Sequence, residues 1–101
     1  MTPLPGYPTK FGNKNVMVAD VPGPSYYFTG GWEIPASDLN WGGFDYVVAG
    51  DSVSATYAAV ARPETTQRFV KVIVRTASSN TEVTYGTDLS AQTFRMLFIG
   101  V

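Results

Sequence analysis

The chain has 101 residues, enough for one domain with a single modest hydrophobic core. It contains no cysteine and no histidine, which excludes disulfides, thiolate and Ser–His nucleophiles, and the common zinc ligand sets. Its net charge of −1 lacks the basic excess of nucleic-acid-binding proteins, and no apolar run approaches the roughly 20 residues of a membrane helix. We therefore expect no metal, no cofactor, no nucleic acid partner and no membrane partner.

Charge is sparse and unevenly placed along the chain. Charged residues make up 15% of the sequence, against about 25% in ordinary domains. Residues 1–61 carry two cations and five acids, for a net charge of −3, whereas residues 62–101 carry five cations and three acids, for +2. The low charge indicates either a surface covered by a partner or a Ser/Thr/Asn-rich β-protein surface. The asymmetry is typical of copies that dock head to tail or of ion pairs within the fold.

Residues 1–14 are rich in proline and glycine and show neither a helical nor a strand period. Pro3, Pro5 and Pro8 fix φ and favour extended neighbours, which predicts an extended arm ahead of a β-domain at residues 15–101. Tyr7 and Phe11 are unusual for a disordered tail. We expect the arm to dock, either on a partner or on its own domain. The first five residues lack both the basic and the apolar regions of a secretory signal peptide.

The next residues predict short strands separated by glycine and proline turns. Strands are expected at 15–20 and 25–29, followed by an irregular stretch at 32–40. Pro35 argues against a central strand there, and Ser37 is placed to cap a single helical turn.

The middle of the chain predicts two further strands. Residues 44–49 alternate, with Phe44, Tyr46 and Val48 expected on one face and a turn at Gly50–Asp51. Residues 53–61 also alternate, although their alanines allow a helix; two neighbouring strands favour a strand. Residues 62–66 are expected to form a loop.

Residues 68–76 are the clearest strand. Val70, Val72 and Val74 share one face, which we expect to line the core, whereas the other face mixes two large apolar residues with two cations. A turn at 78–80 and a return strand at 81–85 complete a hairpin, and Asp88 is placed to cap a helical turn at 89–92.

The last strand, at 93–101, is apolar on both faces apart from Arg95. Such a strand is central in a core or partly covered by another subunit. Short strands at a spacing near ten residues predict an all-β fold, a small β-sandwich or barrel-like domain.

No catalytic motif is present. The sequence contains neither a Ser-x-x-Lys pair nor a glycine-rich phosphate loop. Asp45 and Asp51 provide two acids, and Asp38, Asn40 and Asp45 provide oxygen ligands, but their positions are those of a solvated face and of turns. We expect a protein that is not an enzyme.

Aromatic residues are concentrated in one stretch, since seven of the fourteen fall within residues 26–46. A carbohydrate-binding module uses such rings as a stacking platform, whereas a small sandwich uses them in its core and at subunit contacts. Strand alternation favours the second use.

Three segments resemble the small virion proteins of tailed bacteriophages, most closely capsid cement or decoration proteins. These segments are the opening PGYPTKFGNKN with VMVADVPGPSYY, the middle SDLNWGGFDYVVAGDSVSATY, and the close VKVIVRT with TDLSAQTFRMLFIGV. The resemblance covers the general layout of most of the chain. It implies a compact β-domain on the outer capsid surface that clamps neighbouring major capsid subunits, with the protein made in the host cytoplasm.

The resemblance also implies partners and contact residues. The expected partners are the major capsid protein and sister copies, with a homotrimer favoured. The residues expected to contact the capsid or a sister subunit are Tyr7, Lys10, Phe11, Trp32, Trp41, Phe69 and Arg95. The alternatives are a minor tail or neck component and a carbohydrate-binding adhesion domain.

Overall fold

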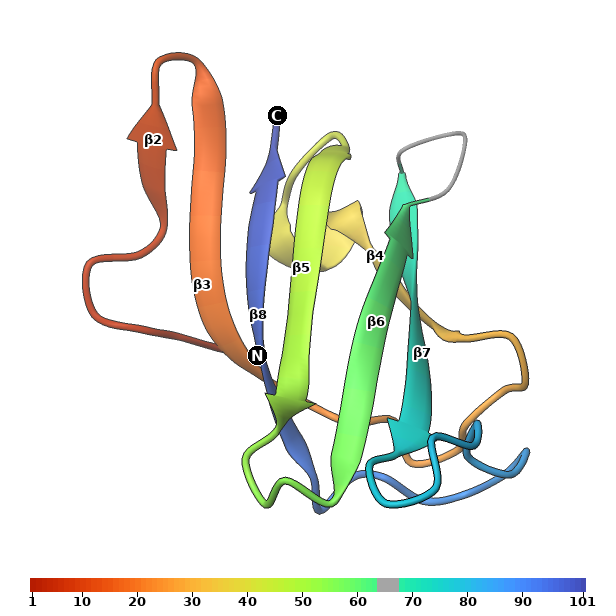
Figure 1. Cartoon of the computed structure of the whole chain (residues 1–101). Helices are drawn as coiled ribbons and strands as arrows, with labels where there is room; N and C mark the ends of the chain where they lie inside the picture. The colour runs from red at the N-terminus through yellow and green to blue at the C-terminus, as the bar shows by residue number, and fades with distance from the viewer. Residues whose placement is uncertain (64–67) are drawn as a thin grey trace.

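The structure is a computed structural model and describes residues 1–63 and 68–101. It contains two antiparallel β-sheets packed against each other (Figure 1). The five-stranded sheet has the order β1–β3–β8–β5, with β2 also paired to β3, and the three-stranded sheet has the order β4–β7–β6. The fold is therefore the small all-β sandwich that the sequence predicts.

The strands and the 3₁₀ helix of the described residues have the following bounds: β1 Thr2–Pro3, β2 Thr9–Phe11, β3 Lys14–Pro22, β4 Trp32–Pro35, η1 Ala36–Leu39, β5 Phe44–Ser52, β6 Tyr57–Pro63, β7 Phe69–Thr76 and β8 Thr93–Gly100.

β7 is the central strand of the three-stranded sheet, and its predicted alternation is confirmed. Val70, Val72 and Val74 are completely buried. Their neighbours Ile34 of β4 and Ala59 of β6 also point into the core. Each fully buried valine contributes roughly 1.5–3 kcal/mol of hydrophobic free energy.

β8 is the central strand of the other sheet, between β3 and β5. Phe94, Met96 and Phe98 point inward and are fully buried. Phe98 stacks with Phe44 of β5 at a centroid distance of 5.4 Å. Leu97 and Ile99 on the opposite face are apolar too, so β8 is central and, apart from Arg95, apolar on its outer face.

β5 departs from the predicted alternation. Its pairing with β8 shifts between Phe44 and Tyr46, which makes Asp45 the extra residue of a β-bulge. Beyond a bulge the side chains change face, so Phe44 and Val47 point inward whereas Tyr46 and Val48 are 57% and 42% exposed. The prediction that Phe44, Tyr46 and Val48 share a face is therefore wrong.

The turn between β5 and β6 also lies later than predicted. Gly50 and Asp51 sit in a second irregularity of β5, between Ala49 and Ser52. The chain reverses at residues 53–56, where the Ala55 amide donates to the Ser52 carbonyl at 2.8 Å. β6 follows as a strand, so the strand interpretation is confirmed over the helical one, although it starts at Tyr57.

The stretch expected to be irregular begins with the edge strand β4. The Ala36 amide donates to the Arg68 carbonyl at 2.8 Å, so this position faces β7. The backbone nitrogen of the preceding residue, Pro35, therefore points to the free edge of β4. Because no strand pairs with that edge, the amide hydrogen that proline lacks is not needed for a hydrogen bond of the sheet. The helical turn exists as η1, but it is preceded by Pro35, has no side-chain cap from Ser37, and ends at Asn40 with φ of 58°.

Three further predictions need correction. Residues 25–29 and 81–85 are not strands, apart from an isolated bridge between Arg75 and Glu82. Residues 89–92 form a non-helical turn instead of the predicted helical turn. The Asp88 carboxylate accepts a hydrogen bond from the Ser90 amide at 2.9 Å. Residues 81–83 nevertheless bond to β7, because the Thr76 amide donates to the Thr81 carbonyl and the Val83 amide donates to the Val74 carbonyl, both at 2.9 Å. The predicted turn at 78–80 is present.

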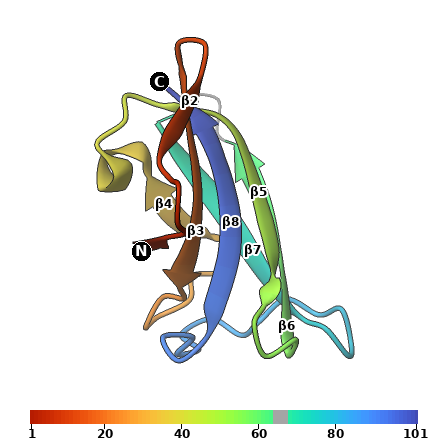
Figure 2. The ribbon, with the colours of Figure 1, turned by 90° about the vertical axis from the view of Figure 1, so that its left-hand side faces the viewer.

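The expected arm lies on its own domain. β1 and β2 both pair with β3, and the Leu4 amide donates to the Val18 carbonyl at 2.9 Å. Tyr7 packs against the core. Figures 1 and 2 show β2 and β3 as a hairpin that projects beyond β8. Of the loop expected at 62–66, Arg62 and Pro63 belong to β6, and 64–66 lie outside the described residues.

Candidate functional site

The candidate site forms on the loop between β3 and β4. Residues 26–28 form no strand, and Tyr26 lies in a bend of the chain, yet the exposure of their side chains alternates. Tyr27 is completely buried, whereas Tyr26 and Phe28 are 49% and 56% exposed. The buried Tyr27 ring therefore anchors the segment that presents the exposed rings of Tyr26 and Phe28 to solvent.

Hydrogen bonds hold Tyr27 in place. Its hydroxyl donates to the Glu82 carboxylate at 2.8 Å and accepts from the Val74 amide at 3.2 Å. The Gly30 amide donates to the same carboxylate at 2.8 Å. The backbone of Tyr27 is bonded to Gly86 and Thr87. The loop is therefore tied both to β7 and to residues 82–87.

This network shifts two pKa values. Burial, followed by the hydrogen bond to Glu82, raises the pKa of Tyr27 to about 12. The amide of Gly30, followed by the Tyr27 hydroxyl, lowers the pKa of Glu82. Both groups therefore keep one protonation state across the neutral range, which makes them structural tethers rather than acid–base catalysts.

Tyr85 joins the two exposed rings from the facing loop. Its ring centroid lies 5.2 Å from Tyr26 and 5.5 Å from Phe28, edge to face in both pairs. Tyr26 and Phe28 are 5.4 Å apart and tilted by 55°. We call Tyr26, Phe28 and Tyr85 the aromatic cluster. Tyr85 is 55% exposed, so three contacting rings face solvent together.

A glycine brings the two loops close. Gly86 has φ of 86°, and a Cβ there would lie 3.3 Å from the Tyr26 ring. A side chain at this position would be strained by the backbone and crowded by the ring. Gly86 thus permits the contact between the loops that forms the aromatic cluster.

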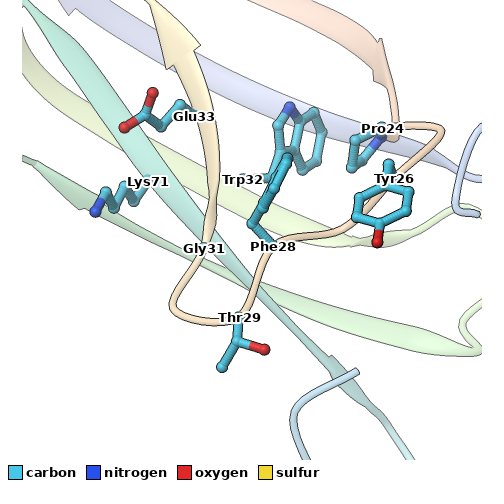
Figure 3. A pocket seen from close by; sticks show the side chains of 8 residues that line it. All are labelled: Pro24, Tyr26, Phe28, Thr29, Gly31, Trp32, Glu33 and Lys71. Atoms are coloured by element: carbon cyan, nitrogen blue, oxygen red, sulfur yellow. The ribbon is translucent and has the colours of Figure 1, made fainter. Parts of the chain in front are cut away.

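A hollow of about 450 Å³ adjoins the aromatic cluster. Figure 3 shows the rings of Tyr26, Phe28 and Trp32 along it, with Glu33 and Lys71 at its other side. Trp32 is half-buried and contacts Phe94 of the core, with ring centroids 5.8 Å apart. The hollow therefore combines fixed apolar walls with charged groups.

A second hollow brings together two predicted contact residues. Trp41 and Phe69 both line it, next to Arg68 and η1. Trp41 also packs against Phe44, at a centroid distance of 6.1 Å, so part of its ring belongs to the core edge.

The remaining predicted contact residues are dispersed. Phe11, 73% exposed, ends β2 at the tip of the projecting hairpin, next to Lys10, whereas Tyr7 is partly buried against the core. Arg95 lies on the outer face of β8 in an ion pair with Asp20 at 2.9 Å. The seven residues therefore do not form one surface.

Sequence reasoning missed the aromatic cluster as a site. Its signal was the density of aromatics at 26–28, but nothing local connects Tyr85 with them. Their contact depends on the backbone hydrogen bonds of Tyr27 with Gly86 and Thr87, which join segments almost 60 positions apart.

Among the residues that the structure describes, no three acidic side chains gather as a metal site, and no helix is long and apolar enough to span a membrane. Asp45, one of the acids considered above, pairs with Lys14 at 2.7 Å. Comparisons with protein-family models, curated proteins and solved structures found no match to this chain.

Proposed function

We propose that this chain is a non-enzymatic structural protein that docks on a larger protein assembly through the aromatic cluster. In its most specific form the proposal is a decoration protein on the outer surface of a phage capsid, in contact with neighbouring major capsid subunits. The capsid assignment rests on the resemblance described above. The observation that supports docking is the exposed aromatic cluster.

Three exposed rings favour a protein contact for an energetic reason. Aromatic side chains dominate binding hot spots because each buries a large apolar area with few rotatable bonds. Here the rings are already held by each other and by the buried Tyr27, so little side-chain entropy is lost on binding.

Docking would stabilise a shell by mass action. A protein that binds the assembled state and not the free subunits favours assembly, by an amount that increases with its concentration relative to its dissociation constant. No reaction is needed.

Cosedimentation with assembled shells of the virus that encodes the chain tests this proposal. Phe28→Ser removes a ring that is 56% exposed, and Val60→Ser is a matched control because Val60 is 55% exposed on β6, the edge strand opposite β4 in the three-stranded sheet. We expect a loss of roughly tenfold or more in affinity for Phe28→Ser and none for the control. Equal binding of both variants and the wild type would refute docking through the cluster.

A carbohydrate-binding domain is the second candidate, and the hollow with Trp32, Glu33 and Lys71 is the observation in its favour. Against it, the cluster rings are tilted by 55–90° and share no plane on which a sugar chain could lie. A glycan array with Trp32→Ala and Trp41→Ala controls separates the two. Binding lost in Trp32→Ala would support the sugar site.

A tail or neck location is a variant of the first proposal and differs in copy number per particle. The trimer implied by the resemblance stays a prediction.

A further inference from the structure

The outer face of the five-stranded sheet is apolar at its centre. Side chains on this face alternate with those that enter the core, and none of its central residues belongs to the core cluster. They come from the three neighbouring strands β3, β8 and β5: Val18, Leu97, Ile99, Tyr46 and Val48. Figure 2 shows these three strands side by side, with β7 behind them.

Charged side chains flank this apolar centre at both ends. Lys14 pairs with Asp45 at 2.7 Å at one end, and Arg95 pairs with Asp20 at 2.9 Å at the other. Each end therefore carries one cation and one anion. An apolar centre with a polar rim is the usual anatomy of a protein–protein interface.

The arrangement of the charges is self-complementary. Lys14 and Asp20 lie on the same strand, six positions and therefore roughly 20 Å apart. If a second copy stacks on this face about a two-fold axis perpendicular to the strands, each β3 lies over the other β3 in the opposite direction. Lys14 of each copy then faces Asp20 of the other.

The second pair of charges fits the same axis. Asp45 lies at the Lys14 end and Arg95 at the Asp20 end, so each end of the interface gathers two cations and two anions. Stacking about an axis parallel to the strands would instead bring the two Arg95 residues of the central β8 strands together. Charge complementarity thus selects the first orientation.

We propose that two copies of this chain pair through the outer faces of their five-stranded sheets, in antiparallel stacking, with the apolar residues of β3, β8 and β5 in the centre. This pairing is independent of the proposed capsid docking, because the aromatic cluster lies on the loops at residues 26–28 and 85 and not on this face.

The size of the face sets the expected strength. Five strands, of which β3 and β5 are the longest at nine residues each, give a footprint of roughly 20 by 30 Å. Stable complexes bury about 800 Å² per partner. The side-chain relief raises the accessible area above the footprint, so the face lies at the lower end of this class. We expect a pair that dissociates on dilution.

Sedimentation velocity from micromolar to millimolar protein tests the proposal. The wild-type mass should rise from 10.9 kDa toward twice that value. Val48→Lys introduces a charge at the apolar centre and should weaken association roughly tenfold or more. Val60→Lys is the matched control, an exposed valine on the outer face of the other sheet, and should associate like the wild type.

A second measurement needs no variant. Amide chemical shifts of the wild type should change with concentration at Leu97, Val18 and Val48 and stay constant at Val60. A monomer at all concentrations, association lost equally in both variants, or shifts at Val60 would overturn the proposal. A trimer, the state that the resemblance implies, would also overturn it, because a two-fold face closes at two copies.

Discussion

The two sheets share one core but differ in the faces that they turn to solvent. The five-stranded sheet shows an apolar centre with two internal ion pairs. The outer face of the three-stranded sheet carries Arg62, Lys71 and Arg75, with Arg62 directly opposite Lys71 and with Glu33 at its edge. Two copies meeting through the second face would bring cations together. Alternation along the strands therefore decides which side chains point inward, whereas the charges decide which outer face suits a second copy.

Gly100→Ala should give the largest effect, on the five-stranded sheet. A Cβ at this position of β8 would collide with the backbone carbonyl of Gly43 and lie 3.1 Å from the Trp41 ring. Backbone cannot easily move away, so we expect the free energy of unfolding to fall by about 3 kcal/mol. Gly42→Ala is the control, because its nearest neighbour would be at 3.7 Å. Thermal unfolding midpoints that fall equally in both variants would contradict the clash.

Tyr27→Phe should weaken the attachment of the loop to the three-stranded sheet. The change removes a donor to Glu82 and an acceptor for the Val74 amide and keeps the buried ring. A buried amide left without its partner costs about 1–3 kcal/mol. We expect urea unfolding to show a loss of this size. A midpoint equal to that of the wild type would mean that the hydroxyl contributes nothing.

The same residue predicts an alkaline transition. The pKa of Tyr27 is about 12 in the folded protein, against 10.0 for an ordinary tyrosine, so the unfolded chain releases its proton first. The contribution of Tyr27 to the free energy of unfolding is fully present below pH 10 and is lost as the pH rises through about 12. Melting temperatures measured over this range should fall less in Tyr27→Phe than in the wild type. Parallel curves would contradict the assignment.

Charge reversal tests the difference between the outer faces. Lys14→Glu places a negative charge opposite Asp20 of the second copy at both ends of the interface, and self-association should weaken roughly tenfold. Arg62→Glu changes the same amount of charge on the three-stranded sheet and should leave association unchanged. Sedimentation velocity gives both values. A larger effect of Arg62→Glu would reverse the comparison.

Asp20→Asn should have the smallest effect on the single copy. Asp20 and Arg95 pair at the surface, and the hydrogen bond from Arg95 lowers the pKa of Asp20. Exposed pairs contribute little because water and salt screen them. The thermal midpoint at neutral pH should stay within measurement error of the wild type. A marked fall would show that this pair supports the fold of the chain itself.

Much of the fold could be predicted from local patterns. The alternation of Val70, Val72 and Val74 identified the core face of β7, and the two-sided apolar pattern of 93–101 identified a central strand. The bulge at Asp45 could not be predicted, because an extra residue leaves no local mark and changes the face of every side chain after it. The arm was correctly predicted to be extended, but its pairing with β3 depends on the tertiary structure and could not be predicted from the arm itself.

The candidate site was predictable only in part. Aromatic density marked residues 26–28, yet the role of each ring depends on hydrogen bonds to distant residues. Arg95 was expected to contact a partner, and its ion pair with Asp20 spans 75 positions of sequence. Such pairs depend on strand register, which the sequence of either strand alone does not specify.

Quantitative mass spectrometry of purified virions tests whether this chain docks on a capsid. It measures the number of copies of this chain relative to the major capsid protein. Docking on the outer shell predicts a ratio near one to one. A handful of copies per particle would favour the tail or neck. Complete absence from virions would contradict the proposed function.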